Sequence, residues 1–133
     1  MVLAEALYSA RFQTQDQTLN IMLEDARTKL LNPDENVRRD SLERLWNAWE
    51  RIKTILKPND KKESISKLVD KCADEPKFRK LLETEAKALT NVGNTFHMRH
   101  SEIGQIEIQR NIQVDYLFHW LFSMLLLAIE SMA

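Results

Sequence analysis

The sequence predicts an all-α protein that folds as a single compact helical bundle of about five to six helices. Apolar residues recur at helical spacing in several separate stretches. Among 133 residues there are only 2 Gly and 3 Pro, too few turn residues for a sheet of many short strands. The one stretch that alternates like a strand, residues 106–109, has no partner strand, so we expect an extended loop there.

Length and composition predict one domain over residues 1–133. A chain of this size buries roughly two thirds of its unfolded surface, which is enough for a core. Apolar residues make up 44% and charged residues 29%, as in ordinary soluble proteins. The abrupt start of the sequence is compatible with a domain excised from a longer chain.

The first half of the chain predicts three helices. Residues 2–12 form a short helix, and a polar run separates it from a helix over about 18–31, where Leu19, Leu23 and Leu30 share one face. Asn32 followed by Pro33 is a start signal for a third helix that ends near Leu56. Its apolar face comprises Val37, Leu42, Leu45, Trp46, Trp49, Ile52 and Leu56. Its opposite face comprises Arg38, Arg39, Glu43, Arg44, Arg51 and Lys53.

The second half predicts three more helices. One covers residues 61–72, and another begins around Asp74-Glu75-Pro76 and reaches about Val92. The last covers about 115–131, with Asp115 as its cap. Between Gly93 and Gly104, periodicity does not decide whether the helix continues or breaks.

Charge, cysteine content and glycine content narrow the possible classes of function and the cellular compartment. The net charge of −1 gives no global signature of nucleic-acid binding, although a local basic site is compatible with it. Two glycines cannot supply a dinucleotide fingerprint or a phosphate loop, and we expect no cofactor. One cysteine suits a reducing compartment, and the start lacks the pattern of a secretory signal, so we expect a cytoplasmic protein.

The apolar run at residues 116–129 is too short for a membrane span. It covers about 14 positions and contains His119, whereas a span needs about 20 apolar residues. We interpret it as a buried helix, central in the bundle or half of a dimer interface.

Residues 94–102 concentrate the chemistry of the chain. Histidine exchanges protons near neutral pH, and arginine offers a cationic fork for a phosphate. Such a set suits general acid–base chemistry on a phosphodiester. A solvated helix end is an equally ordinary interpretation. A metal held by His97 and His100 is a further alternative, and its third ligand would come from Glu102 or elsewhere. The candidate catalytic residues are Asn94, His97, Arg99, His100 and Glu102.

Two further features accompany this segment. The helices around residues 37–57 and 77–100 each have an excess of basic residues, so they would form a basic groove if they lie together. Asp115, His119 and Ser123 lie on one helical line in the order of a catalytic triad. A shared stripe is poor geometry for nucleophilic attack, so we interpret His119 as a satisfied core histidine.

Three stretches together resemble a known family. They are residues 41–54 (SLERLWNAWERIKT), 90–102 (TNVGNTFHMRHSE) and 115–119 (DYLFH). They are similar to the C-terminal helical domains of bacterial abortive-infection (AbiJ-like) proteins, of the HEPN class. The likeness spans most of residues 35–130 and implies a HEPN-like helical bundle, commonly a homodimer. Many members are metal-independent ribonucleases of phage defence or toxin–antitoxin systems.

The resemblance also implies roles for the candidate residues. The family signature is an Arg, a polar residue, then a His four to six residues after the Arg. His100 matches the histidine and would transfer protons, whereas the position six before it is Asn94, and the available arginine, Arg99, is adjacent to His100. Arg99 would hold the scissile phosphate, Asn94 and His97 would assist, Glu102 would orient, and no metal would be needed.

These features lead to two expectations of function. One is an endoribonuclease domain that acts on RNA as a homodimer, with a linked effector domain or an antitoxin as a further partner and no membrane association. The alternative is a non-catalytic domain of an abortive-infection protein that binds RNA, dimerises or regulates.

Overall fold

A computed structural model of the protein describes residues 12–96 and 104–132. These residues form α-helices and loops, without a β-strand in the described ranges, which confirms the prediction of an all-α helical bundle. The helices are α2 (Gln17–Leu30), α3 (Glu35–Ile55), α4 (Lys61–Cys72), α5 (Pro76–Thr95) and α6 (Asn111–Met132). The helix expected over residues 2–12 lies outside the described residues, except for Phe12.

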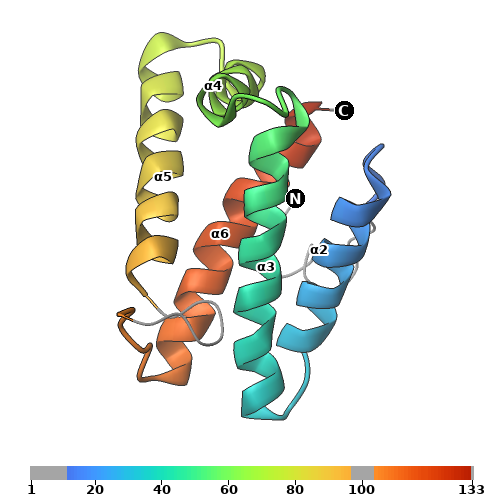
Figure 1. Cartoon of the computed structure of the whole chain (residues 1–133), viewed down its shortest axis with the longest axis vertical. Helices are drawn as coiled ribbons and strands as arrows, with labels where there is room; N and C mark the ends of the chain where they lie inside the picture. The colour runs from blue at the N-terminus through green and yellow to red at the C-terminus, as the bar shows by residue number, and fades with distance from the viewer. Residues whose placement is uncertain (1–11, 97–103, 133) are drawn as a thin grey trace.

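The bundle is arranged around α3 (Figure 1). Helix α2 runs beside α3 as its antiparallel neighbour, α6 crosses behind α3, and α4 lies across one end of the bundle. Helix α5 lies on the side of α3 opposite to α2, and it descends from α4 toward the start of α6. Residues 96 and 104–110 therefore lie at the end of the bundle far from α4.

Acidic side chains cap the first four of these helices. Carboxylates of Asp16, Asp34, Asp60 and Glu75 accept hydrogen bonds from backbone N–H groups in the first turns of α2, α3, α4 and α5. Such caps satisfy N–H groups that have no partner within the helix, and each contributes about 1 kcal/mol. The predicted start of α3 at Asn32-Pro33 is wrong by two residues. Asn32 instead accepts a hydrogen bond from the Asp34 backbone N–H, and Asp34 caps the helix.

Two other helix ends differ from the prediction. Helix α5 continues through Gly93 to Thr95, beyond the expected end at Val92. Helix α6 begins at Asn111, and Asp115 lies in its second turn, so Asp115 is not the cap. The Arg38 guanidinium binds both oxygens of the Asp115 carboxylate, at 2.8 and 2.9 Å. Residues 106–109 form the expected loop, with one isolated bridge between Phe96 and Ile106.

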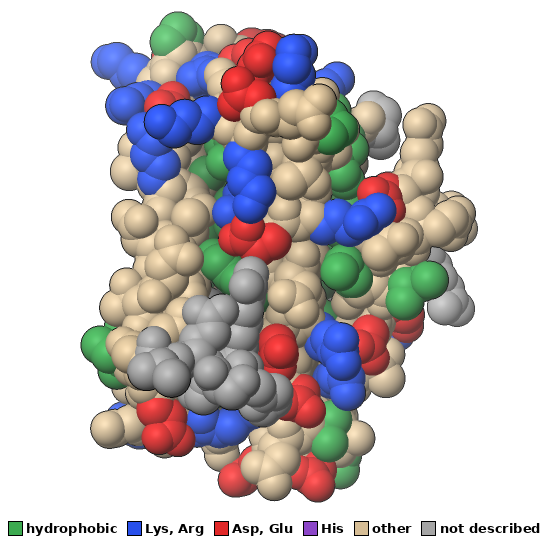
Figure 2. Space-filling view, viewed as in Figure 1, with side chains coloured by type: hydrophobic (Ala, Val, Ile, Leu, Met, Phe, Trp, Pro, Cys, Tyr) green, Lys and Arg blue, Asp and Glu red, His purple; other side chains and the backbone are tan. Residues whose placement is uncertain are grey.

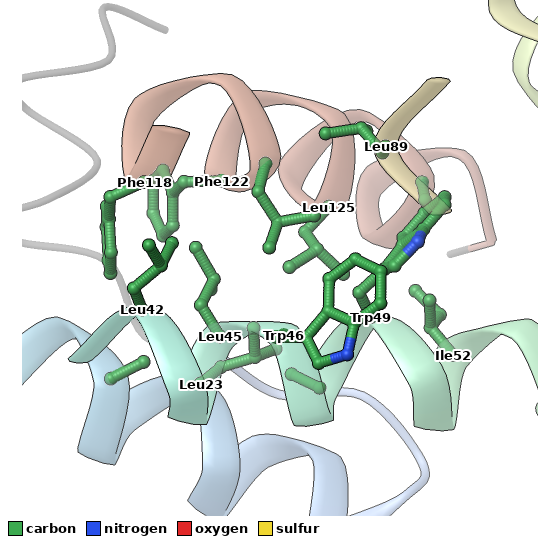
Figure 3. Close-up of a cluster of buried hydrophobic side chains, with 14 of the residues drawn as sticks. Leu23, Leu42, Leu45, Trp46, Trp49, Ile52, Leu89, Phe118, Phe122 and Leu125 are labelled. Carbon is green, nitrogen blue, oxygen red and sulfur yellow. The ribbon is translucent and has the colours of Figure 1, made fainter. Parts of the chain in front are cut away.

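The core lies between α3 and α6, and α2, α4 and α5 complete it. Figure 3 shows Phe118, Phe122 and Leu125 of α6 facing α3, with Leu23 of α2 and Leu89 of α5 at the edges. Trp46 and Trp49 are 2% and 1% exposed, which makes them the largest side chains of this core. Burying a side chain of this kind contributes about 2–3 kcal/mol, so the paired tryptophans do much to hold α3 in the centre.

Helix α6 is buried along one face and exposed along another, so the prediction of a central buried helix is wrong, and the alternative of a dimer interface stays a prediction. Phe118, Leu121 and Leu125 are fully buried, whereas Ile112 and Tyr116 are 65% and 68% exposed. In the described part of the chain, α6 is the one helix that is long and apolar enough to cross a membrane, so the prediction that this stretch is too short was wrong. Of that window, 33% is buried in the bundle. The core helix of a soluble protein passes the same test.

Candidate functional site

One of the five candidate residues belongs to the described structure. Asn94 lies exposed in the last turn of α5. His97, Arg99, His100 and Glu102 lie outside the described residues. The structure therefore describes where this segment leaves α5 and where the chain returns.

Hydrogen bonds join residues 93–95, where the chain leaves α5, to residues 105–106, just after the described chain resumes. The Gln105 side-chain amide donates to the carbonyl oxygens of Gly93 (3.1 Å) and Asn94 (3.3 Å). The Ile106 backbone N–H donates to the Thr95 carbonyl at 2.9 Å. The last carbonyls of a helix have no partner within it, and Gln105 satisfies two of these groups. We call the two hydrogen-bonded stretches, residues 93–95 and 105–106, the stem.

Helix α3 holds the chain that leads from this stem into α6. The Arg39 guanidinium donates to the Ile108 carbonyl at 2.7 Å and to the Asn111 side chain at 3.3 Å. One turn into α6, Asp115 binds Arg38. The returning chain is thus attached to two adjacent arginines of α3, and the stem, α3 and α6 form one connected end of the bundle.

Helices α3 and α5 meet at a glycine. The benzo edge of Trp46 occupies the space that a side chain would take at Gly93, because a Cβ there would lie 2.0 Å from Cη2. Gly93 itself is buried in the last turns of α5. This contact places the C-terminal end of α5, and with it Asn94, against the middle of α3.

A buried lysine forms the second contact between α3 and α5. Lys53 is 3% exposed, and its Nζ lies 2.8 Å from the Glu50 carboxylate and 3.2 Å from the Thr90 hydroxyl. The ammonium lies 5.6 and 5.5 Å from the ring centroids of Trp46 and Trp49, within the range of a cation–π contact. The placement of Lys53 on the charged outer face of this helix was wrong. It follows Trp46 by seven residues and Trp49 by four, and this spacing puts it on their face.

Glu50 connects this cluster to α4. Its second carboxylate oxygen lies 3.2 Å from Lys61 Nζ. Burial raises the pKa of Glu50, but the hydrogen bonds and charges of Lys53 and Lys61 outweigh burial and hold that pKa below its ordinary value. Glu50 therefore stays ionised near neutral pH, between two ammonium groups.

His119 does not form a triad with Asp115 and Ser123. Its Nδ1 lies 2.7 Å from the Asp115 backbone carbonyl, so Nδ1 is the protonated nitrogen and donates there. The Ser123 hydroxyl donates to the Trp120 carbonyl and is exposed. The interpretation of His119 as a satisfied histidine is confirmed, although its ring is half-buried and not in the core.

The basic groove expected between α3 and α5 is replaced by one between α4 and α5. Three of the four α3 arginines bind carboxylates outside α3: Arg38 binds Asp115, Arg44 binds Asp25, and Arg51 binds Asp16. Their charge is thereby neutralised away from α5. A groove of about 590 Å³ lies between α4 and α5. Figure 2 shows Lys and Arg side chains gathered at the end of the bundle where α4 lies. The groove is lined by Lys62, Ile65, Ser66, Arg79, Glu83, Ala86, Lys87, Thr90 and Asn91.

Sequence reasoning missed Gln105 and the role of Lys53. The signal for Lys53 is its position on the tryptophan face, where a charged residue needs buried partners. Gln105 follows Gly104, whose φ of +89° turns the chain back toward α5, but no sequence pattern indicates which residue closes the turn. Within residues 12–96 and 104–132, no group of three or more His, Cys, Asp and Glu residues is arranged to hold a metal ion.

Comparisons with protein-family models, with curated proteins and with solved structures find no match to this chain. The fold and the described part of the site define an all-α helical bundle with a hydrogen-bonded stem at one end. The resemblance to abortive-infection proteins stays a prediction from the three sequence stretches.

Proposed function

We propose that the chain is a HEPN-type, metal-independent endoribonuclease domain of phage defence (abortive infection) or of a toxin–antitoxin system, and that it acts in the cytoplasm. The observation that carries the proposal is the stem. Its hydrogen bonds join residues 93–95 to residues 105–106, on the two sides of residues 97–103 and next to the exposed side chain of Asn94. A catalytic segment needs such support, because its groups act only when they are held in a defined geometry.

The residues of the segment would cleave RNA without a metal. The ribose 2′-oxygen attacks the adjacent phosphorus, its proton passes to a base, and the 5′-oxygen of the next nucleotide leaves with a proton from an acid. His100 would carry out the proton transfer, and Arg99 would stabilise the charge of the phosphate, as a cation does in phosphoryl chemistry. Asn94 and His97 would assist, and Glu102 would orient a histidine.

A homodimer is part of the proposal. Two copies would place two such segments around one RNA, and the exposed apolar side chains of Ile112 and Tyr116 near the start of α6 support self-association. A linked effector domain or an antitoxin would control the activity.

Product chemistry tests the proposal directly. RNA from a mixed cellular pool is incubated with the purified protein and excess chelator, and the new ends are identified. Attack by the 2′-oxygen leaves a 2′,3′-cyclic phosphate and a 5′-hydroxyl, and these are the expected ends. Cleavage that stops in chelator, or that leaves 5′-phosphates, would overturn the proposal.

A second candidate is a non-catalytic domain that binds RNA, dimerises or regulates an abortive-infection protein. Asn94 at the position where the family signature has arginine favours it, together with the exposed apolar residues of α6. Saturable RNA binding without cleavage, in the presence of the cognate partner domain, would support this candidate over the first.

A further inference from the structure

The groove between α4 and α5 combines a basic lining with a direct connection to the candidate segment. Three of its lining residues, Lys62, Arg79 and Lys87, are cationic, and Glu83 is its one carboxylate. Ser66 and Asn91 add neutral polar groups, whereas the Thr90 hydroxyl is bound to Lys53 and to the Ala86 carbonyl. Short polar side chains and cations are the groups that contact phosphate oxygens in nucleic-acid interfaces.

The α5 side of the groove points toward Asn94. Glu83, Lys87 and Asn91 follow one another at four-residue spacing, and Asn94 lies three residues further on. Residues three and four apart lie on the same helical face, so Asn94 continues the line of the groove by one turn. From Arg79 to Asn94 this line measures about 22 Å, at about 1.5 Å per residue.

The cations are arranged around Glu83. Arg79 Nη1 lies 3.0 Å, Lys87 Nζ 3.4 Å and Lys80 Nζ 4.0 Å from its carboxylate. Arg79 is also held by Asp70 and by the Ser66 hydroxyl at 3.0 Å. Lys80 and Lys87 are 72% and 71% exposed, so their ammonium groups remain accessible to a ligand. Two carboxylates, Glu83 and Asp70, stand against three cations, so the cluster keeps a net positive charge.

Lys62 adds a positive charge on the α4 side. It is exposed and forms no ion pair with a residue of the described ranges. The groove therefore presents a cation from each of its two walls. An extended polyanion fits this arrangement better than a single small anion, because Arg79 and Lys87 lie about two turns apart on α5 and Lys62 lies on the opposite wall.

We propose that the α4–α5 groove binds the phosphate backbone of a single RNA strand and guides that strand to the Asn94 end of α5. This inference rests on the proposed function, which supplies RNA as the substrate. Binding is independent of sequence, because cations and short polar groups contact the backbone, and it weakens steeply with salt.

The test measures binding of a fluorescent 12-nucleotide 2′-O-methyl RNA, which lacks the 2′-hydroxyl needed for cleavage. We expect K62A/K87A to raise Kd about tenfold and to lower the slope of log K against log salt by about 1.4. E83Q removes the only carboxylate of the lining, so we expect it to lower Kd. The control is K29A, on α2 at the opposite side of α3, which leaves Kd unchanged (Figure 1).

Opposite shifts in K62A/K87A and E83Q would support the inference, because damage to the fold would weaken binding in both. If K62A/K87A has the same Kd and the same salt slope as the wild-type protein, the inference is overturned. Displacement of the strand by a poly-glutamate peptide at equal charge concentration would also overturn it, since the groove would then suit an acidic protein.

Cleavage of unmodified RNA, measured in parallel, separates this inference from the proposed function. If the wild-type protein cleaves RNA and K62A/K87A binds RNA as tightly as the wild type does, the groove inference is overturned and the ribonuclease proposal is supported. If K62A/K87A binds RNA more weakly but the wild-type protein does not cleave RNA, the groove inference is supported and the ribonuclease proposal is overturned.

Discussion

The benzo edge of Trp46 packs against Gly93, so closely that a Cβ at residue 93 would lie 2.0 Å from the indole. This contact brings the middle of α3 against the last turns of α5. Asn94 and the Gln105 stem lie directly beside it. The packing of one tryptophan on one glycine thus places the end of α5 from which the candidate segment departs.

Gly93→Ala tests this packing. Alanine is favoured over glycine within a helix by about 1 kcal/mol, so an unhindered site would gain stability. Because the methyl group collides with a buried indole, we expect a net loss of about 1–3 kcal/mol in the free energy of unfolding. Urea denaturation measures it.

A smaller residue at 46 provides the control. Combined with Trp46→Leu, the Gly93→Ala change is expected to cost much less than it does alone, because the colliding ring is absent. Equal costs in both backgrounds would contradict the proposed clash.

Asp115→Asn distinguishes an ion-pair role from a capping role. Asparagine caps helices as well as aspartate does, so a cap would tolerate the change. Because Asp115 binds Arg38 through both oxygens, we expect a loss of about 1 kcal/mol. A double-mutant cycle with Arg38→Met should show that the two losses are coupled. Additive losses would refute the pair.

Stability should fall in acid through Glu50. Because Lys53 and Lys61 outweigh the effect of burial, the pKa of Glu50 in the folded protein lies below its ordinary value of 4.5. The contribution of Glu50 to stability is therefore complete above that value and is lost as the pH falls through the lower folded pKa. We expect Glu50→Gln to be less stable than wild type at pH 7. The difference should shrink below about pH 4.5 in urea denaturation. A difference independent of pH would contradict this role.

Self-association should depend on the exposed start of α6. We expect the wild-type protein to sediment as a dimer and the I112E/Y116E variant as a monomer, because a charge at an apolar interface must be desolvated. The matched control is I21E, which changes an equally exposed isoleucine (69%) on α2. A wild-type monomer, or loss of the dimer in I21E as well, would rule out this interface.

Much of the fold could be predicted because periodicity and capping residues act locally. The helix at residues 61–72 was predicted at its observed bounds, since Asp60 caps it and Pro58-Asn59 ends the helix before it. The errors at Asn32 and Asp115 arose because several acidic or amide residues near each start can cap a helix. Asp115 is instead bound to Arg38 of α3, a tertiary contact that the local sequence does not reveal.

The candidate site was less accessible to such reasoning. Lys53 resembles a solvated charge until its register with Trp46 and Trp49 is considered, and its partner Thr90 is 37 residues away. Within α5, Gly93 packs against Trp46, a contact between residues 47 positions apart that no local pattern reveals. The distribution of the α3 arginines among α2 and α6 is likewise a tertiary property.

The most direct test of the central claim compares His100→Ala with His119→Ala in RNA cleavage under excess chelator. His119 is the matched control, because its Nδ1 is bound to the Asp115 carbonyl and we assign it no role in the chemistry. We expect the His100 variant to lose cleavage by about a hundredfold or more, as for a general acid or base, and the His119 variant to retain it. Full activity of the His100 variant would contradict the claim that residues 94–102 form a ribonuclease site.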